Sequence, residues 1–161
     1  MAQEISTYDE ALMVVRQCGC MLEYIPEEFK MEDICFAAVG HEGWALEFVP
    51  EKLKTMEMCR KAVKQDGSAL EFVPEELKTA EFCLEVVAQS GWALEYVPEK
   101  FKTAELCLVA VQVRGIALEH VPERFKTAEL CTEAVRQDGW ALEHVPDWLK
   151  LKVAVQSEKQ E

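Results

Sequence analysis

Apolar residues recur along this chain in a pattern that repeats every 24 residues. In the copy that begins at Thr79, the first apolar residues follow the i, i+1, i+4, i+5 spacing of one buried stripe on a helix. Thr79 is a natural N-cap, and Gly91 suits the left-handed residue that commonly follows a helix end. The pattern therefore predicts a first helix over residues 79–90, with a stripe made of Phe82, Cys83, Val86 and Val87.

A second, shorter helical element follows the glycine in each copy. Ala93, Leu94 and Val97 repeat the helical spacing. Pro98 ends this element, because proline lacks an N–H and disfavours the helical conformation of the residue before it. The residues after Pro98 predict one further turn, which begins at the proline and holds Phe101 inward.

Six copies of this unit follow one another without a linker. One helical hairpin cannot bury its own stripe, whereas stacked copies form a continuous core. The sequence therefore predicts an all-α fold, an α-solenoid of six 24-residue hairpin repeats that forms a curved rod. We expect an N-terminal lead-in (1–6), a single repeat domain (7–150) and a C-terminal cap or tail (151–161). The repeat units are 7–30, 31–54, 55–78, 79–102, 103–126 and 127–150.

A 24-residue period also occurs in leucine-rich repeats, in which Leu-Glu-Phe-Val would be a strand. The alternating L-x-L pattern and the following Asn of that repeat are missing here. The helical solenoid is therefore the favoured interpretation.

The end units differ from the others as terminal repeats do. Thr7 and Glu10 have the spacing of a capping box. After Lys150 the chain begins a seventh first helix, Leu-Lys-Val-Ala-Val. We expect this segment to cover the open face of the last unit, with Trp148 helping.

The repeat resembles a known family. Its best-matched form reads Ala-Val-x-x-x-Gly-x-Ala-Leu-Glu-(Tyr/Phe)-Val-Pro-Glu-(Glu/Lys)-(Leu/Phe)-Lys-Thr. Residues 7–150 are similar to a bacterial helical repeat catalogued only as a domain of unknown function. The resemblance implies tandem helical arrays and supplies neither catalytic residues nor a ligand. Val-Pro, where many members have Ala-Ser, is a departure from the family pattern.

The chain is acidic, with 17 basic and 30 acidic residues, a formal charge of −13 and a pI near 4.7. This charge disfavours direct binding to nucleic acid or to anionic membranes and favours a basic protein partner. We expect a soluble, cytoplasmic protein, because the sequence shows no leader and no membrane-spanning apolar run.

Five cysteines recur at the 24-residue interval, too far apart across stacked helices to pair. We expect them to be buried thiols in a reducing compartment. They are Cys35, Cys59, Cys83, Cys107 and Cys131.

Partner specificity should reside at exposed positions that differ between units. The residue after the turn glycine varies from Ser to Trp, which a close-packed site would not accept. We therefore expect an exposed aromatic edge, although each Trp could instead cover a gap between units. The candidate partner-binding residues are Trp44, Trp92 and Trp140 at this position, with Tyr24, Phe48, Phe72, Tyr96, His120 and His144 before the Val-Pro pair.

Two further surfaces are candidates. A carboxylate recurs in every unit and predicts an acidic stripe, made of Glu23, Glu47, Glu71, Glu95, Glu119 and Glu143. It is either a solvated face paired with lysines or an acidic mimic of nucleic acid that occupies a basic groove. An apolar series could form an exposed ridge, suited to a partner or a homodimer, or pack against the adjacent unit. This series is Leu12, Phe36, Leu84, Leu108, Val109 and Val113.

Catalysis has little support in the sequence. Cys18-Gly-Cys20 is a weak metal or redox signal, and the usual phosphate-loop, zinc-protease and serine-hydrolase motifs do not occur. His120 and His144 lie one unit apart, too distant to share a metal ion. We predict a non-enzymatic scaffold for protein binding, with no cofactor and no metal.

Overall fold

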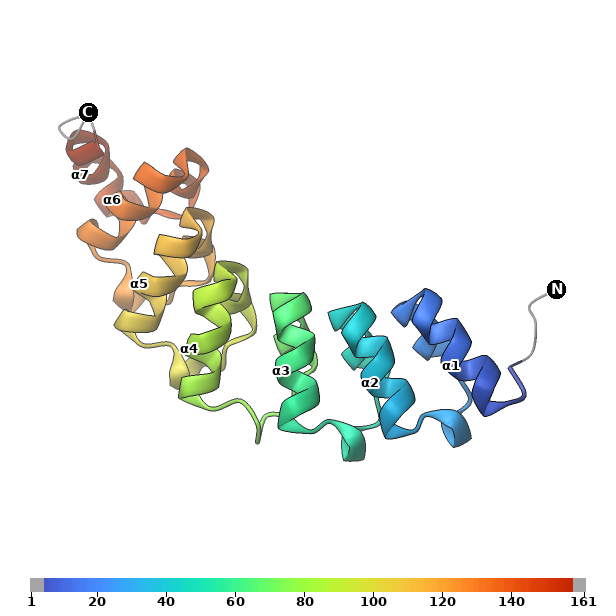
Figure 1. The fold of residues 1–161 in the computed structure, drawn as a ribbon. Helices are drawn as coiled ribbons and strands as arrows, with labels where there is room; N and C mark the ends of the chain where they lie inside the picture. Colours follow the sequence, from blue (N-terminus) through green and yellow to red (C-terminus); the bar gives the residue numbers. More distant parts are fainter. Residues whose placement is uncertain (1–4, 158–161) are drawn as a thin grey trace. The chain divides into compact units, whose positions relative to one another are not determined.

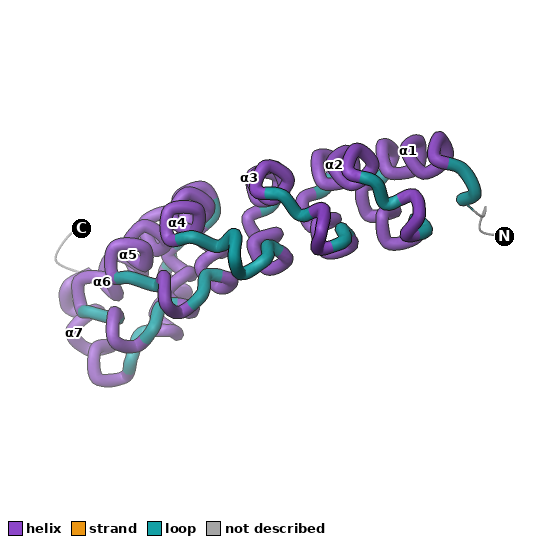
Figure 2. Tube along the Cα trace, turned by 90° about the horizontal axis from the view of Figure 1, so that it is seen from below, coloured by secondary structure: helices purple, strands orange, loops and turns teal. Residues whose placement is uncertain are grey.

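The computed structural model describes residues 5–157, and within this range every regular element is a helix (Figure 2). The prediction of an all-α helical repeat is thereby confirmed. The longer helices are α1 (Tyr8–Gln17), α2 (Glu32–His41), α3 (Met56–Gln65), α4 (Ala80–Gln89), α5 (Ala104–Val113), α6 (Ala128–Gln137) and α7 (Asp147–Ser157).

The chain divides into two compact units, residues 1–77 and 78–161. Within the first unit, α1, α2 and α3 pack side by side in chain order, and within the second α4 to α7 do the same (Figure 1). The division falls one residue before the boundary between the third and fourth repeats. The expectations of a single domain over 7–150 and of a curved rod stay predictions.

The second element of each repeat is a six-residue 3₁₀ helix. In the fourth repeat, Val97 N–H donates to the Leu94 carbonyl at 3.3 Å, and Val97 itself is extended before Pro98. Proline therefore ends this element, as predicted. The six are η1 (Gly19–Tyr24), η3 (Gly43–Phe48), η5 (Gly67–Phe72), η6 (Gly91–Tyr96), η8 (Gly115–His120) and η10 (Gly139–His144).

A single 3₁₀ turn follows the proline in most repeats. The proline is the extended residue just before the turn, with ψ of 138° at Pro98, and is not the first residue of the turn as predicted. In the third repeat the same residues, 75–77, form a hydrogen-bonded turn. The turns are η2 (Glu27–Phe29), η4 (Glu51–Leu53), η7 (Glu99–Phe101) and η9 (Glu123–Phe125).

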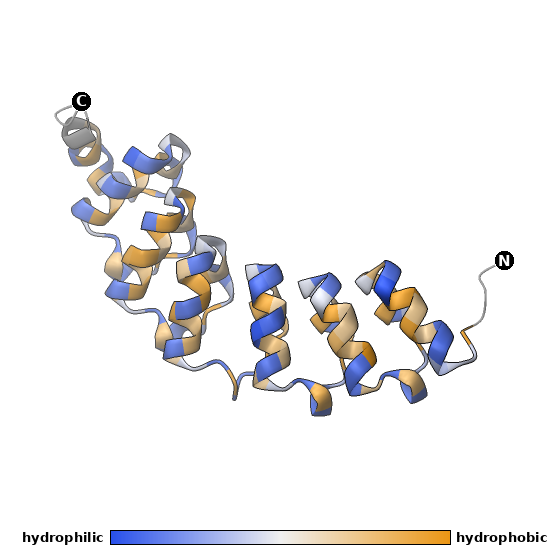
Figure 3. Ribbon diagram, in the orientation of Figure 1, coloured by the Kyte–Doolittle hydropathy of each residue, from blue (hydrophilic) through white to orange (hydrophobic). Residues whose placement is uncertain are grey.

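The core is built from the same positions of successive repeats. Helices α1 to α6 each carry both apolar and polar residues (Figure 3), and the predicted stripe of α4 is buried. The leucine of the 3₁₀ helix is the largest recurrent core residue. It is fully buried at Leu22, Leu46, Leu70, Leu94 and Leu118.

The predicted threonine caps are present. Thr79 accepts a hydrogen bond from Phe82 N–H at 3.2 Å, and Thr7 and Glu10 form the complete capping box. These caps satisfy N–H groups that lack a partner inside the helix.

The turn glycines serve a purpose that differs from the predicted one. No residue in the described part of the chain has a positive φ, so the left-handed Gly91 predicted from the sequence is wrong. The helix ends instead at an extended residue, Ser90. A Cβ at Gly43 would lie 2.4 Å from the Ala62 carbonyl oxygen of the next repeat, and one at Gly115 would lie 2.4 Å from that of Ala134. Glycine is required because the next helix approaches this closely.

The C-terminal helix α7 starts earlier than the sequence suggested and packs against α6. Leu149 and Val153 are buried, one helical turn apart on the same face. Trp148 is 75% exposed, so the prediction that it helps to cover the last unit is wrong. It lies next to Leu149 in sequence and therefore on a different face. Parts of the predicted lead-in and tail, residues 1–4 and 158–161, lie outside the described residues.

The five recurrent cysteines are buried thiols, as predicted. Cys18 and Cys20 form a disulfide that the sequence analysis did not predict. Burial raises the pKa of four thiols from 9.0 to about 11: Cys35, Cys59, Cys107 and Cys131.

These raised pKa values predict a loss of stability in alkali. The pKa of each thiol is higher in the folded chain, so the unfolded chain releases its thiol protons first as pH rises. The free energy of unfolding should be fully retained below pH 9.0 and fall as pH rises toward about 11. Urea midpoints measured across this range test it, and replacing Cys107 with Ala should weaken the decline. A midpoint that is constant up to pH 11 would contradict the prediction.

A lysine near the end of three repeats connects each of them to the next one. Lys126 is 8% exposed, and its ammonium donates to Glu123 Oε1 at 2.8 Å and to the His144 carbonyl at 3.2 Å. Lys54 donates to the Phe72 carbonyl at 3.0 Å in the same way. A buried ammonium with these bonds links the turn of one repeat to the 3₁₀ helix of the next.

Replacing Lys126 with Met should destabilise the fold by about 1–2 kcal/mol, because a charged hydrogen bond is lost and a partly buried carbonyl loses its donor. Thermal unfolding followed by circular dichroism measures the change. Lys150 is the matched control, because it pairs with Asp147 but its side chain is 43% exposed. Lys150→Met should change stability by less than about 0.5 kcal/mol. Equal effects of the two substitutions would contradict the connecting role of the buried lysine.

Candidate partner-binding surfaces

The tryptophans after the turn glycines differ in exposure. Trp140 is 73% exposed and Trp44 is 37% exposed, whereas Trp92 is half-buried. The Trp92 ring lies 4.9 Å from the Arg114 guanidinium and 6.1 Å from the His120 ring, both of the next repeat. Trp92 therefore covers the junction with the next repeat, which was the alternative interpretation for this position.

Trp140 is exposed because its repeat has no such neighbour. A Cβ built at the adjacent Gly139 would meet nothing within 4 Å. Trp44 belongs to the first compact unit, and Trp92 and Trp140 belong to the second. An edge that uses all three tryptophans therefore stays a prediction.

The residues before the Val-Pro pair are mostly half-buried. Tyr24 is 65% exposed, but Phe48, Phe72, Tyr96, His120 and His144 are half-buried. Each histidine faces a carboxylate of the preceding repeat. His120 Nε2 lies 3.8 Å from Glu95 Oε2, and His144 Nε2 lies 3.8 Å from Glu119 Oε2. Both histidines thus contribute to the contacts between neighbouring repeats.

The predicted acidic stripe is exposed at every position: Glu23, Glu47, Glu71, Glu95, Glu119 and Glu143. Two of its members, Glu95 and Glu119, face histidines as described above. A second series of carboxylates pairs with the lysines three residues later, as in Glu51 with Lys54 at 2.7 Å. Local pairing therefore accounts for much of the acidic surface.

Four apolar side chains form an exposed ridge on the neighbouring helices α4 and α5. We call Ala80, Leu84, Ala104 and Leu108 the apolar ridge. Leu84 is 36% and Leu108 is 40% exposed, and both alanines are exposed. Of the other residues in the predicted apolar series, Val113 is 41% exposed, whereas Leu12, Phe36 and Val109 are half-buried.

Two hollows with acidic rims adjoin the apolar ridge. The hollow between α4 and α5 has a volume of about 310 Å³ and is lined by Leu84, Phe101 and Leu106, with Glu81 and Glu105 beside them. A second hollow of about 400 Å³ lies between α5 and α6, and Leu108, Phe125 and Leu130 line it, with Glu129 and Glu133 beside them. Apolar floors with acidic rims suit a segment that carries both apolar and basic side chains.

The equivalent place on α6 is already covered. Ala128 and Thr132 correspond to Ala104 and Leu108, yet they are only 5% and 8% exposed. The helix packed against α6 is α7. The pKa of Glu129 is lowered by hydrogen bonds from its own backbone and from Thr127, and further by the positive charge of Lys152 on α7. Helix α7, which carries apolar residues and Lys152, therefore covers this surface of α6.

Leu84 and Leu108 were predicted from the sequence, whereas the exposed alanines and the hollows were not. Ala80 and Ala104 precede these leucines by four residues, the spacing of one helix face. This spacing was the available signal. The hollows depend on the separation of neighbouring helices, which the spacing within one helix does not determine.

A family model described as a domain of unknown function, DUF4116, matches residues 31–78 and again residues 80–126. Each match spans two of the 24-residue repeats, and together they cover more than half of the chain. Neither a curated protein nor a solved structure matches the chain. None of the helices in the described residues is both long and apolar enough to cross a membrane.

Proposed function

Because the chain belongs to the DUF4116 family of domains of unknown function, which names no ligand or reaction, we propose its role from its surface. The protein is a non-catalytic, cytoplasmic scaffold whose apolar ridge binds an amphipathic helix of a protein partner. Five buried cysteine thiols support the reducing compartment.

The observation that carries this proposal is the difference between α6 and its neighbours. On α6, a helix bearing apolar residues and Lys152 covers Ala128 and Thr132. On α4 and α5 the side chains at the same positions are exposed. They offer a larger apolar surface, because each helix has leucine where α6 has Thr132, and hollows with acidic rims adjoin them. The partner segment therefore has apolar side chains at i and i+4 and basic residues beside them, as α7 has.

The proposal is tested by replacing Leu84 and Leu108 together with Ser and measuring the proteins captured from the native cell by quantitative mass spectrometry. Both leucines are partly exposed, so each substitution should cost roughly 1 kcal/mol of stability, and circular dichroism should show that the variant stays folded. Captured partners with a basic amphipathic helix should bind about tenfold more weakly or worse. A variant that retains every partner at the wild-type level contradicts the ridge as a binding surface.

The matched comparison is the aromatic edge, with Trp44, Trp92 and Trp140 all replaced by Ser. The apolar ridge predicts that this variant keeps the partners that the leucine variant loses. The opposite pattern would assign binding to the aromatic edge.

An acidic competitor for a basic, nucleic-acid-binding groove is the second candidate, favoured by the exposure of all six glutamates of the acidic stripe. The two functions differ in their response to salt. Binding through the apolar ridge should change little between low and moderate salt, whereas binding through the stripe should fall steeply.

A further inference from the structure

Four residues depart from the repeat pattern, and they lie at one junction. The first repeat alone has Cys18 and Cys20 around its turn glycine. The second repeat alone ends its first helix with His41, where most copies have Gln, and follows it with Glu42, where the others have Cys, Asp, Ser or Arg. These substitutions do not serve the general stacking of repeats, because the other repeats stack without them.

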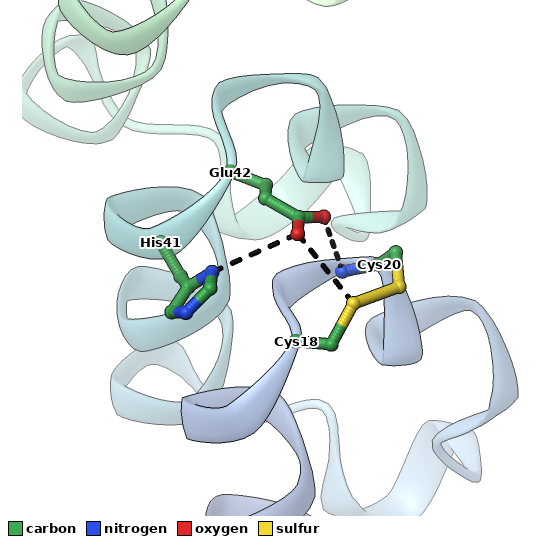
Figure 4. A network of polar contacts seen from close by, with 4 residues as sticks. All are labelled: Cys18, Cys20, His41 and Glu42. Atoms are coloured by element: carbon green, nitrogen blue, oxygen red, sulfur yellow. Dashed lines mark hydrogen bonds and ion pairs between the residues drawn. A yellow bond between two sulfur atoms is a disulfide. The ribbon is translucent and has the colours of Figure 1, made fainter.

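The contact between repeats brings these residues together. Gly19 lies so close to α2 that a Cβ on it would be 3.2 Å from Glu42 Cβ. Cys20 N–H donates to Glu42 Oε2 at 2.9 Å, and Glu42 Oε1 lies 3.5 Å from Cys18 Sγ. His41 Nδ1 lies 3.7 Å from the same Oε1. Figure 4 shows the Glu42 carboxylate between the cysteine pair and the imidazole.

The 3.5 Å between Cys18 Sγ and Glu42 Oε1 matches the spacing of neighbouring ligand atoms around a tetrahedral metal ion, whereas the two sulfur atoms are bonded to each other and would have to move apart. Bonds of about 2.3 Å to sulfur and about 2.1 Å to oxygen place neighbouring ligand atoms roughly 3.4–3.8 Å apart. The two Sγ atoms and the Glu42 carboxylate all lie within 4.8 Å of one another. Cys20 N–H and His41 contact the carboxylate from either side. Groups that contact a metal ligand in this way orient it toward the metal.

We propose that Cys18, Cys20 and Glu42 bind a thiophilic divalent cation of the zinc type when the disulfide is reduced. Two thiolates and a carboxylate are anionic groups that repel one another, and a divalent cation compensates this charge. Thiolate and carboxylate ligands with one position left to water suit Zn²⁺. His41 is a positioning residue that orients the carboxylate.

The disulfide and the metal site are alternative states of the same two sulfur atoms. A dithiol reductant breaks the Cys18–Cys20 bond, gives two thiols and itself becomes a disulfide. Binding of the cation then releases two thiol protons to water and forms two metal–sulfur bonds. In the oxidised chain neither sulfur is a thiolate, so the cation does not bind there.

The test compares the oxidised chain with the chain reduced by a phosphine, each titrated with Co²⁺ without oxygen and then with Zn²⁺ in competition. The reduced chain should bind one ion and show thiolate-to-cobalt absorption that Zn²⁺ abolishes, while the oxidised chain should show neither. Equal binding by the two forms, or no cobalt–thiolate absorption in the reduced form, would overturn the site. This comparison of the oxidised and reduced chains needs no substitution, so the effect of a substitution on folding cannot account for its result.

Variants then assign the ligands. Cys18→Ser with Cys20→Ser should abolish the absorption, and Glu42→Gln, which keeps an acceptor for Cys20 N–H, should weaken Zn²⁺ binding about 10-fold or more. His41→Gln restores the residue of other repeats and should weaken binding while leaving the cobalt–thiolate absorption in place. Asp66→Asn, at the position of Glu42 in the next repeat, is the control and should leave the affinity unchanged. Binding unaffected by Glu42→Gln would remove Glu42 as a ligand and overturn the three-residue site.

This site extends beyond the proposed scaffold. It lies within residues 1–77, whereas the apolar ridge lies within residues 78–161. Replacing Leu84 and Leu108 should leave metal binding intact, so the two proposals can fail separately.

Discussion

Replacing Leu118 with Ala should destabilise the protein by about 2–5 kcal/mol, the largest single effect that we expect. Leu118 is fully buried in η8, between the helices of its own repeat and the next. Removing its side chain forfeits apolar burial and leaves a cavity that close-packed neighbours cannot fill. Urea unfolding followed by far-ultraviolet circular dichroism measures the loss.

Leu142 provides the control, because it occupies the same position in the last repeat and is 39% exposed. Leu142→Ala should cost roughly 1 kcal/mol, since less of its apolar surface leaves water on folding. The difference between two chemically identical substitutions isolates the contribution of the neighbouring repeat. If both variants lost the same stability, the leucine would be held by its own hairpin and not by stacking.

The period made much of the fold predictable from the sequence. A threonine cap, an apolar stripe and a proline stop each act within one repeat; the proline recurs in all six repeats, and the threonine and the full four-residue stripe recur in most of them. Thr79 and Pro98 consequently begin and end elements where expected. Local chemistry of this kind is readable without knowledge of what packs against the repeat.

Two of the features that were mispredicted depend on the next repeat. Gly91 was assigned a left-handed conformation because helices often end in one, but here the constraint is a carbonyl of the following helix, at 2.7 Å from a Cβ built on the glycine. The exposure of Trp92 and Trp140 differs because only Trp92 has a repeat beside it. A single repeat carries no information about such contacts.

Contacts between repeats nevertheless follow a simple interval. Lys126 reaches the carbonyl of residue 144, Cys20 N–H reaches residue 42, and His120 lies against residue 95. All these pairs are separated by 18 to 25 residues, close to the 24-residue period. Searching the sequence for unusual side chains at this interval would have placed His41 and Glu42 beside Cys18 and Cys20. The apolar ridge would have remained hidden, because it requires knowing which positions the neighbouring helix leaves uncovered.

Replacing Gly115 with Ala should cost about 3 kcal/mol, the upper end of the usual penalty for overpacking. The new Cβ would lie 2.4 Å from the Ala134 carbonyl oxygen and 3.0 Å from Asp138 N, and backbone atoms cannot move aside without displacing α6. Gly139→Ala introduces the same methyl group at the same repeat position with nothing within 4 Å. It should be neutral or stabilise the protein by about 0.4–1 kcal/mol, because alanine loses less backbone freedom on folding. Thermal unfolding of both variants distinguishes two explanations for the glycine. A similar loss of stability in both variants would mean that the local backbone requires glycine. Stability changes of opposite sign would mean that the close approach of the next repeat requires it.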